Sequence, residues 1–562
     1  MSSPDVPAIK RAGLPVDLDR LAREGDEWLS PEERYALKTH GVCAQSQPGV
    51  FMIRVRTSDG ELDSDTAREL AGLADRLSGG WLHLTTRQQA ELHHVPARQV
   101  PATIDAVADL GLTTRSACGH TVRGIMSCAH ADVSLDEPFD CTPDATALAA
   151  HVAARGPDID PYMPQRLNVA FGGCPACREH AKLNDIGFAS VRRGDEPGYQ
   201  VWLGGSLGKS MPTLAFCAFD FVARSDVIAM FEAVRFVFTS LAKFDKPNKA
   251  RLKFLARELG RERLIEQVAT ALETARADYP MTPAPVASSE PDHAAALAHQ
   301  PPGGWRSGVR PAREPGYAVA TVNVPLGDVD GDDVRTLADL ADAVADGRLR
   351  LTRNQNVSLF LPVDAVPGLE ARLEGLGLSL AGADQARDVR ACTGGPVCSL
   401  AITPAQKVAH QLLSTPALRR NAQLRVHVSG CQNACAQQQI ADLGFSGSKI
   451  TIHGEGVLGY QVWVGGDLTT DRVGTVIGRV AESDVVAITE ALVGAWEALC
   501  APSESMADTV ERVGTEALRG HLRAVFSGRW EPGPEPEEPE LPDVLGERRP
   551  PAGPDGELRR VA

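Results

Sequence analysis

The stretch GVFMIRVRTSDGELDSDTARELAGLADRLSGGWLHLTTRQQAELHHVPARQVPATIDAVADLGL, residues 49 to 112, decides the fold because the chain contains a second copy of it. The partner is YAVATVNVPLGDVDGDDVRTLADLADAVADGRLRLTRNQNVSLFLPVDAVPGLEARLEGLGL, residues 317 to 378. Each copy reads as a strand, a helix, a strand ending in LTTRQ or LTRNQ, and a second amphipathic helix closed by Leu-Gly-Leu. We interpret the two copies as equivalent units of one duplicated fold.

A second block of sequence is also repeated, and it lies downstream of the first block in each half. NDIGFASVRRGDEPGYQVWLGGSLG, residues 184 to 208, matches ADLGFSGSKITIHGEGVLGYQVWVGGDLT, residues 441 to 469. Between the halves lies a segment rich in Pro, Ala and Gly, residues 281 to 308, which we interpret as the crossing linker. The chain therefore consists of two halves that share one plan around a pseudo-twofold axis.

The composition is that of a globular protein with several domains. The 562 residues exceed what one hydrophobic core usually organises, and 43% of them are apolar. No apolar run reaches the roughly 20 residues that span a bilayer, and the amino terminus lacks the apolar stretch of a signal peptide. A cytoplasmic location is therefore expected. The net charge of −16 argues against a nucleic-acid-coating surface and favours small anions or proteins as partners.

Four of the 12 cysteines form two close pairs in the second half. Cys392 and Cys398 lie in ACTGGPVC, and Cys431 and Cys435 lie in GCQNACAQQQIADLGF. Four thiolates suit an iron-sulfur cluster or zinc. Zinc normally uses more closely spaced pairs than Cys392 and Cys398, so the spacing favours a cluster.

Glycines beside these cysteines support the same interpretation. They remove side chains where the backbone must approach a bulky centre and where amides can hydrogen-bond to sulfur, and they are Gly394, Gly395 and Gly430. The alternative is that the four cysteines are simply small, buried apolar residues. Two pairs beside glycines, with Asp-Leu-Gly-Phe following, favour the metal centre.

These motifs also carry a resemblance to a known family. ACTGGPVCSLAIT and VSGCQNACAQQQIADLGF resemble the signature of the sirohaem and 4Fe-4S nitrite/sulfite reductases, and the LTTRQ and LTRNQ repeats look like that family's duplicated ferredoxin-like half-domains. The resemblance covers roughly residues 40 to 520. It implies that Cys392, Cys398, Cys431 and Cys435 hold the cluster, and that Cys435 also bridges to the sirohaem iron.

The resemblance implies an α+β fold, the pseudo-twofold duplicated nitrite/sulfite reductase fold with ferredoxin-like half-domains and sirohaem/4Fe-4S-binding domains. The expected units are an N-terminal extension (1–40), a first ferredoxin-like half-domain (41–115), a first sirohaem-reductase-type domain on the substrate side (116–280), the linker (281–310), a second ferredoxin-like half-domain (311–382), a sirohaem/4Fe-4S-binding domain (383–525) and a Pro- and Glu-rich tail expected to be disordered (526–562).

The resemblance further implies an anion pocket over the other face of the sirohaem. Reducing an oxyanion requires positive charge to bind it and proton donors to remove oxygen as water. Carried over residue by residue, the pocket consists of Arg54, Arg123, Arg166 and Asn168. Taken singly, Arg54 or Arg166 is more simply a surface residue, whereas the apolar surroundings of Arg123 favour a function.

The pair Arg166 and Asn168 departs from the family pattern and bears on the substrate. Sulfite reductases of the family carry Lys-x-Lys at this place, and nitrite reductases typically carry Lys-x-Asn. Asn168 lowers the positive charge by one, which favours singly charged nitrite over sulfite. Because an arginine does not readily lose its proton, Arg166 is expected to serve as an electrostatic clamp.

The two matching turns supply candidate ligands for the cofactor. Sirohaem carries eight carboxylates, and the residues expected to bind it are Arg87, Gln88, Arg353, Asn354 and Gln355. The basic loop KPNKARLKFL, residues 246 to 255, is either a family element facing the cofactor or a solvated helix start. No dinucleotide-binding or flavin-binding segment is evident, so ferredoxin is the expected electron donor. A monomer is expected.

The first half contains cysteines that the family pattern does not require, namely Cys43, Cys118, Cys128, Cys174 and Cys177. Cys174 occupies the place of Cys431, because both precede the repeated Asp by the same distance, but Arg178 stands where Cys435 would map. A second metal centre, buried thiols and a redox-sensitive pair all remain open. By family likeness, Cys43 stands where some relatives have a tyrosine. This likeness suggests a covalent link between Cys43 and Cys118.

The leading hypothesis is the six-electron reduction of nitrite to ammonia, with sulfite reduction to sulfide as the alternative. Two other readings remain. One is a relative that acts as a monooxygenase in the cobalamin pathway, against which the paired turns and the complete arginine set argue. The other is a non-catalytic iron-sulfur scaffold or sensor, which would hold iron and sulfide without sirohaem or reductase activity.

Overall fold

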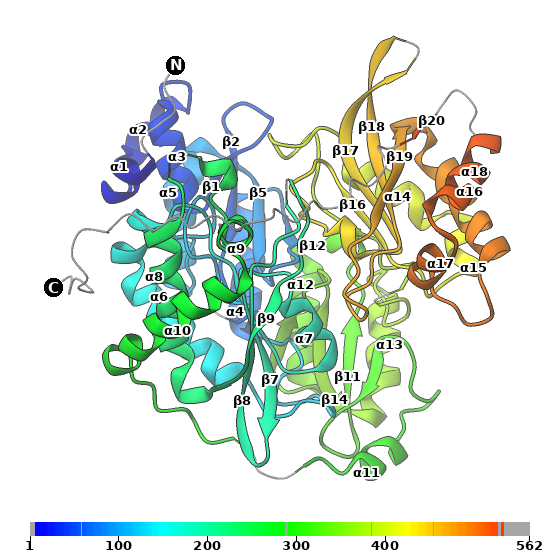
Figure 1. The fold of residues 1–562 in the computed structure, drawn as a ribbon, viewed down its shortest axis with the longest axis horizontal. Helices are drawn as coiled ribbons and strands as arrows, with labels where there is room; N and C mark the ends of the chain where they lie inside the picture. Colours follow the sequence, from blue (N-terminus) through cyan, green and yellow to red (C-terminus); the bar gives the residue numbers. More distant parts are fainter. Residues whose placement is uncertain are drawn as a thin grey trace.

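The strands of the two repeated stretches form two antiparallel sheets of the same design. Figure 1 shows the computed structural model, which describes residues 6–57, 59–208, 210–244, 246–286, 290–383, 385–452, 454–525 and 530–532. The first sheet has the order β1 (Val42–Ala44), β2 (Val50–Val55), β5 (Ala90–Pro96), β4 (Trp81–Leu84), β12 (Asp328–Asp330). The second has the order β10 (Val309–Pro311), β11 (Tyr317–Val322), β14 (Val357–Pro362), β13 (Arg348–Leu351), β3 (Glu61–Asp63).

Each sheet ends in a strand that comes from the opposite half of the chain. Strand β12 of the second half pairs with β4 of the first half, and β3 of the first half pairs with β13 of the second. Helix α4 (Ser64–Leu77) and its counterpart α12 (Gly331–Val344) pack against each other. The predicted duplication is confirmed, and the exchange of strands makes the two half-domains one unit.

Each repeat contains two strands more than the sequence pattern suggested, a short one before its first helix and one after the turn. LTTRQ is a turn between β4 and β5, and LTRNQ is the equivalent turn between β13 and β14. Both turns include a residue with positive φ, Gln88 at 56° and Gln355 at 68°. The helices that close the repeats are α5 (Val100–Asp109) and α13 (Val366–Glu374).

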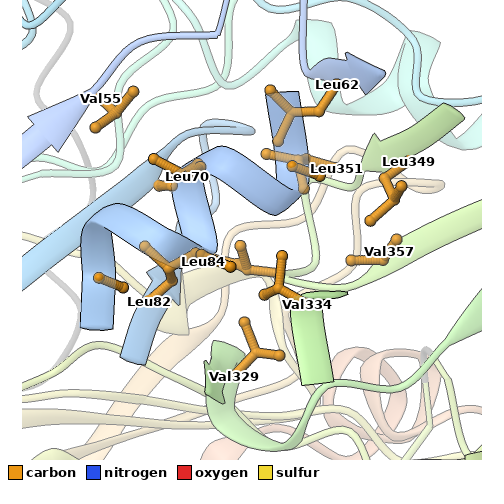
Figure 2. Close-up of a cluster of buried hydrophobic side chains, with 14 of the residues drawn as sticks. Val55, Leu62, Leu70, Leu82, Leu84, Val329, Val334, Leu349, Leu351 and Val357 are labelled. Atoms are coloured by element: carbon orange, nitrogen blue, oxygen red, sulfur yellow. The ribbon is translucent and has the colours of Figure 1, made fainter. Parts of the chain in front are cut away.

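One hydrophobic core is shared by both half-domains. It includes Leu70 on α4 and Val334 on α12, both buried. Figure 2 shows side chains from the two halves of the chain together, among them Val55, Leu82 and Leu349. Burying this apolar surface between the halves stabilises their pairing, because an isolated half-domain would expose it to water.

Each half continues into a larger unit with its own sheet and core. The sheet of the first unit has the order β6 (Val169–Gly172), β7 (Ile186–Arg193), β8 (Glu196–Leu203), β9 (Phe216–Ala223). The sheet of the second unit has the order β15 (Arg390–Ala391), β16 (Val426–Ser429), β17 (Leu443–Ile452), β18 (Glu455–Val464), β19 (Thr475–Ala481), β20 (Trp530–Pro532).

Helices complete the two larger units, and in Figure 1 most of those of the first unit lie on the left and those of the second unit on the right. Those of the first unit are α6 (Thr142–Ile159), α7 (Pro175–Ala181), α8 (Val227–Leu241), α9 (Leu252–Leu259) and α10 (Arg261–Asp278). Those of the second unit are α14 (Ala405–Leu413), α15 (Pro416–Arg420), α16 (Val485–Leu499), α17 (Met506–Val513) and α18 (Thr515–Val525).

The remaining helices lie outside the repeated blocks. The amino-terminal segment forms α1 (Val6–Arg11), α2 (Leu18–Glu24) and α3 (Pro31–Thr39), and the predicted linker contains the short helix α11 (His293–Ala298). Within the described residues, no helix combines the length and the apolar character needed to cross a membrane. The tail expected to be disordered, 526–562, lies outside the described residues except for β20.

Candidate functional site

Parallel strands bring the cysteines of the second half together. Strand β15 ends directly before Cys392, and β16 ends directly before Gly430 and Cys431. The two strands are parallel neighbours, and the Cys392 N–H donates to Val428 O at 3.2 Å. Because the carboxyl ends of parallel strands meet at one sheet edge, both cysteines emerge at the same place.

The glycines beside these cysteines have the role that the sequence predicted. The Gly430 N–H donates to Cys392 Sγ at 3.2 Å. A Cβ on Gly430 would lie 3.0 Å from Gly394 Cα, so the two segments approach more closely than side chains would allow. Gly394 also has a φ of +59°, a conformation that favours glycine. The loops around the cysteines therefore depend on these two residues.

Cys392 and Cys435 both have a raised pKa, to which neighbouring cysteines of the set contribute. Burial, then Cys435, raises the pKa of Cys392, with Cys431 and Cys398 contributing. Burial raises the pKa of Cys435 to about 12, with Cys431 and Cys398 adding to it. Cys435 is exposed to solvent, but enough protein lies around it for burial to raise its pKa.

The spacing of these thiols does not suit a single ion. No three of their sulfurs lie within 4.8 Å of one another. A tetrahedral zinc site with Zn–S bonds of ~2.3 Å holds its sulfurs only about 3.8 Å apart. The four residues therefore fit a bulkier centre such as an iron-sulfur cluster, the interpretation that the sequence favoured.

Arg54 is the pocket arginine that carries a carboxylate partner. Its Nε donates to Glu91 Oε1 at 2.8 Å, across the pairing of β2 with β5. Burial alone would lower the pKa of Arg54, but Cys118, Glu91 and Cys43 raise it well above the usual value. The positive charge of Arg54 is thereby fixed, and it also lowers the pKa of Cys435.

Three further arginines share this region and repel one another. Burial lowers the pKa of Arg87, and Arg123, Arg166 and Arg54 lower it further. Arg123 is buried and donates from Nη2 to Gly119 O at 2.9 Å, while its Nε has no hydrogen-bond partner. The structure thus brings Arg54, Arg87, Arg123 and Arg166 together.

Arg166 and Asn168 lie directly before β6, on either side of the buried Leu167, which bridges Val122. Arg166 Nε and Asn168 Oδ1 are both buried without a hydrogen-bond partner. Arg251 is the main cause that lowers the pKa of Arg166 to about 9, followed by burial and Arg123. Cys435 acts in the opposite direction on Arg166, which links the pair to the cysteine region.

The basic loop at residues 246–255 is divided: Lys246 and Lys249 are exposed, whereas Arg251 and Lys253 are buried. Arg251 is buried and donates from Nη2 to Asp185 Oδ2 at 2.8 Å. Burial lowers the pKa of Lys253 to about 8, with Arg251 and Arg166 contributing. Lys253 Nζ donates to the carbonyls of Ser206, Gly208, Ser210 and Met211 at 2.8 to 3.2 Å.

Lys253 thereby holds the backbone at Ser206, Gly208, Ser210 and Met211 beside the pocket. A Cβ on Gly208 would lie 3.1 Å from Arg166 Nη2 and 3.1 Å from Asn433 O, which stands between Cys431 and Cys435. The structure supports the interior interpretation for Arg251 and Lys253, and the solvated helix start for Lys246 and Lys249.

The gathered cations provide a test of whether an anionic cofactor fits. Several guanidinium groups share a buried space, and each lowers the pKa of its neighbours. Buried charges are stable only when they are paired, and buried polar atoms usually have hydrogen-bond partners. Arg123 Nε, Arg166 Nε and Asn168 Oδ1 have none. The two donors, Arg123 Nε and Arg166 Nε, fit a macrocycle with many carboxylates together with a small anion, whereas the Asn168 oxygen is an acceptor.

Gln88 and Gln355, both expected to bind the cofactor, instead connect the two half-domains. Gln88 Nε2 donates to Leu351 O at 2.9 Å, and Gln355 Nε2 donates to Leu84 O at 2.9 Å. Gln355 Nε2 also donates to Ala391 O at 2.9 Å, one residue before Cys392. Their amide donors are committed to backbone carbonyls, so the structure does not place them in the arginine pocket.

The second turn also points away from the arginine pocket. Arg353 is buried and donates to the carbonyls of Cys177, Ser127 and Phe171, at 2.9 Å to Cys177 and 3.0 Å to Ser127. Asn354 Oδ1 accepts from Arg390 Nη2. Arg353 thus lies against the cysteines of the first half, whereas Thr86 in the matching turn donates to Cys435 O at 2.9 Å.

Cys43 and Cys118 lie together beside the pocket as free thiols. Cys118 is the main cause that raises the pKa of Cys43, and Cys43 is the main cause that lowers the pKa of Cys118. Arg54 and Arg123 also lower the pKa of Cys118. The covalent link between the two residues stays a prediction.

Two residues of the site were missed in the sequence. Arg56, two positions after Arg54, has a pKa lowered to about 10 by burial, with Arg123 as a neighbouring charge. Glu91 is the cross-strand partner of Arg54 and has a lowered pKa. The alternation in FMIRVR indicates that Arg54 and Arg56 share one strand face, but the partner of Arg54 required the strand register.

Comparison with known proteins gives two matching family models. The nitrite/sulfite reductase ferredoxin-like half domain matches residues 44–110 and 310–376. The nitrite and sulphite reductase 4Fe-4S domain matches residues 118–275 and 382–528. The ranges follow the two repeats and the two larger units, so the matches account for most of the chain.

Similar proteins include both nitrite and sulfite reductases. A ferredoxin–nitrite reductase of Synechococcus elongatus is 28% identical, covering 82% of this chain and 90% of that protein. An assimilatory ferredoxin-dependent nitrite reductase of Haloferax mediterranei is 29% identical, covering 91% of each. A sulfite reductase (ferredoxin) of Mycobacterium tuberculosis is 30% identical, covering 85% of this chain and 91% of that protein.

A solved structure shares the fold over nearly the whole chain. The structure of the Mycobacterium tuberculosis NirA protein matches with a TM-score of 0.77 and 26% identity, covering 91% of this chain and 96% of that one. The predicted fold class is confirmed by this likeness and by the family models.

Proposed function

Because the chain belongs to the nitrite and sulphite reductase family, we propose that it reduces nitrite to ammonia in a six-electron reaction with ferredoxin as the electron donor. The chain is an oxidoreductase of this family, whose cofactors are a 4Fe-4S cluster and sirohaem. When bound, the two cofactors would relay the electrons from ferredoxin and supply the iron at which the anion is reduced. Cys392, Cys398, Cys431 and Cys435 would hold the cluster, with Cys435 shared with the sirohaem.

The arginine pocket would bind and orient the anion. Arg123 presents an unpartnered Nε from a buried position, and Arg54 has its charge fixed by Glu91. Guanidinium groups bind oxyanions through paired N–H donors. Arg87 and Arg166 add positive charge, which would also balance the carboxylates of the macrocycle. The loop that Lys253 holds limits the space beside Arg166.

The observation that carries the choice of nitrite is the pair Arg166 and Asn168. Both present unpartnered polar atoms, but only Arg166 carries a charge. The Asn168 carbonyl oxygen accepts a hydrogen bond and its amide nitrogen donates one, so this position recognises a small polar group without adding charge. Such a pair suits singly charged nitrite better than sulfite, which can lose a second proton and carry two negative charges.

Sulfite is the second candidate substrate. The Mycobacterium tuberculosis relative is a sulfite reductase by name, and its identity to this chain is as high as that of the nitrite reductases. The four gathered arginines would also accommodate a doubly charged anion. The named relatives give no support to a corrin monooxygenase or a non-catalytic scaffold, and neither is proposed further.

The experiment is a direct comparison of the two anions as substrates. The purified enzyme, with reduced ferredoxin, is given nitrite or sulfite, and kcat/KM is measured from ammonia or sulfide formed. We expect the higher kcat/KM with nitrite. A higher kcat/KM with sulfite would reject the assignment of nitrite while leaving the family reaction in place.

A further inference from the structure

Three cysteines of the first half form a group of their own. The sulfurs of Cys128, Cys174 and Cys177 all lie within 4.8 Å of one another, and all three residues are buried. In the part of the chain that the structure describes, no other group of three or more His, Cys, Asp or Glu residues meets this distance. Neither the family reaction nor the arginine pocket uses these thiols.

Strand register shows where this group lies relative to the predicted cluster ligands. In the second half, Arg390 pairs with His427 in parallel, two residues before Cys392. In the first half, Met126 pairs with Ala170 in parallel, two residues before Cys128. Cys128 therefore occupies the place of Cys392.

The same comparison places the second thiol. Val169 pairs with Ile186 as Val426 pairs with Leu443, so Cys174 occupies the place of Cys431. The Cys174 N–H donates to Cys128 Sγ at 3.3 Å, much as the Gly430 N–H donates to Cys392 Sγ at 3.2 Å. The first half thus retains half of the cluster-binding arrangement.

The first half differs from the second in a way that changes the centre it can hold. Arg178 stands at the place of Cys435, so a full set of cluster ligands is missing. Cys177, on α7, instead brings a third sulfur close to the other two. An iron-sulfur cube spreads its ligands widely, whereas one ion of ~2.3 Å bond length draws three sulfurs close together. The group is therefore suited to a single ion.

Glu137 lies near the three thiols but outside the 4.8 Å group that they form. Glu137 is 4% exposed, and within the described residues neither of its carboxylate oxygens has a hydrogen-bond partner. A Cβ on Gly173 would lie 3.1 Å from Glu137 Oε2, 3.4 Å from Cys128 Cβ and 3.4 Å from Cys141 Sγ, so the Glu137 carboxyl group lies near the Cys128 side chain. A buried carboxylate without a partner is costly unless a cation compensates it.

A positive group balances the thiolates on the other side. Arg353 donates to the carbonyls of Cys177 and Ser127, and it is buried against this region. Soft thiolates with one carboxylate are a ligand set that Zn²⁺ accepts in tetrahedral geometry.

We propose that Cys128, Cys174 and Cys177 bind one Zn²⁺ ion through three thiolates, with Glu137 as the fourth ligand. The ion joins the loop after Met126 to the start of α7. Arg353 attaches the second half-domain to the same place, so the ion stabilises the contact between the two halves. This site is independent of the substrate assigned to the enzyme.

The test is metal analysis of the whole protein, purified anaerobically without chelators. Zinc and iron are measured by mass spectrometry, and the zinc environment by X-ray absorption at the zinc edge. We expect about one zinc per chain in addition to the iron, with three sulfur neighbours at ~2.3 Å and one lighter neighbour. Absence of zinc, or zinc surrounded only by oxygen and nitrogen, would overturn the proposal.

Variants locate the ion. The Cys177→Ser protein should contain no zinc. The Glu137→Gln protein should lose its zinc on brief exposure to a chelator. The iron content of both should stay unchanged. The matched control is Cys217→Ser on β9, a half-buried cysteine outside the group, which should retain zinc. Four additional irons per chain, or a disulfide between two of the three cysteines in the untreated protein, would contradict the single-ion site.

Discussion

At the scale of single residues, Asn168 has the most direct influence on the choice of substrate. Its Oδ1 is unpartnered and its neighbour Arg166 is charged. Asn168→Lys adds one positive charge to a buried pocket, so we expect the ratio of kcat/KM for nitrite to that for sulfite to fall about tenfold, equivalent to ~1.4 kcal/mol. The measurement is steady-state turnover of both anions. Asn168→Leu is the neutral control, and an equal fall in both variants would show that charge is not the cause.

Cys435 is the residue on which the coupling of the two cofactors depends. Burial, Cys431 and Cys398 raise the pKa of its thiol, and Arg54 lowers it. Cys435→Ser should abolish turnover and the sirohaem absorption band, because the shared sulfur is lost. Cys500→Ser, a substitution of a half-buried cysteine on the far side of the unit after α16, serves as control. A Cys435→Ser protein with both the band and activity intact would reject the bridging role.

At the scale of elements, the two matching turns hold the half-domains together. Gln355 donates to Leu84 O and Ala391 O from a buried position. Gln355→Leu leaves both carbonyls unsatisfied, at a cost of about 1–3 kcal/mol for each. We expect a clear fall in the thermal unfolding temperature, measured by calorimetry. Gln300→Leu, at an exposed position near α11, should leave it unchanged, and equal unfolding temperatures for both variants would contradict this role.

The loop after Cys398 is the element where we expect ferredoxin to approach. Leu400 is 58% exposed and Ile402 is 36% exposed, both within four residues of Cys398. Exposed apolar residues that lie together mark a site of protein–protein interaction. Leu400→Glu should lower kcat/KM for ferredoxin roughly tenfold, about 1.4 kcal/mol, without affecting turnover with a small chemical reductant. Leu458→Glu, at a 43% exposed leucine on β18, is the control, and equal effects would argue against this surface.

At the scale of the whole molecule, the duplication was the feature most accessible from the sequence. The repeated strand and helix patterns predicted two equivalent units, and glycines and spacing singled out the four cysteines of the second half. The arginines expected in the pocket do gather, because each belongs to a motif with fixed neighbours. The structure places them together, although their roles stay predictions until they are tested.

Other features required the three-dimensional pairing of the chain. The TRQ and TRNQ motifs indicate turns, but not that Gln88 and Gln355 reach across to the opposite half-domain. The exchange of β3 and β12 cannot be read from local patterns, because each strand is only three residues long. Cys128 could be matched to Cys392 only through the register of the bridge at Met126.

We propose that the four cysteines of the second half hold a 4Fe-4S cluster coupled to sirohaem. The most direct measurement is the iron, acid-labile sulfide and extractable sirohaem of the anaerobically purified protein. We predict about five irons, about four sulfides and about one sirohaem per chain. A colourless protein with neither iron nor sirohaem, from cells that supply both cofactors, would contradict the account.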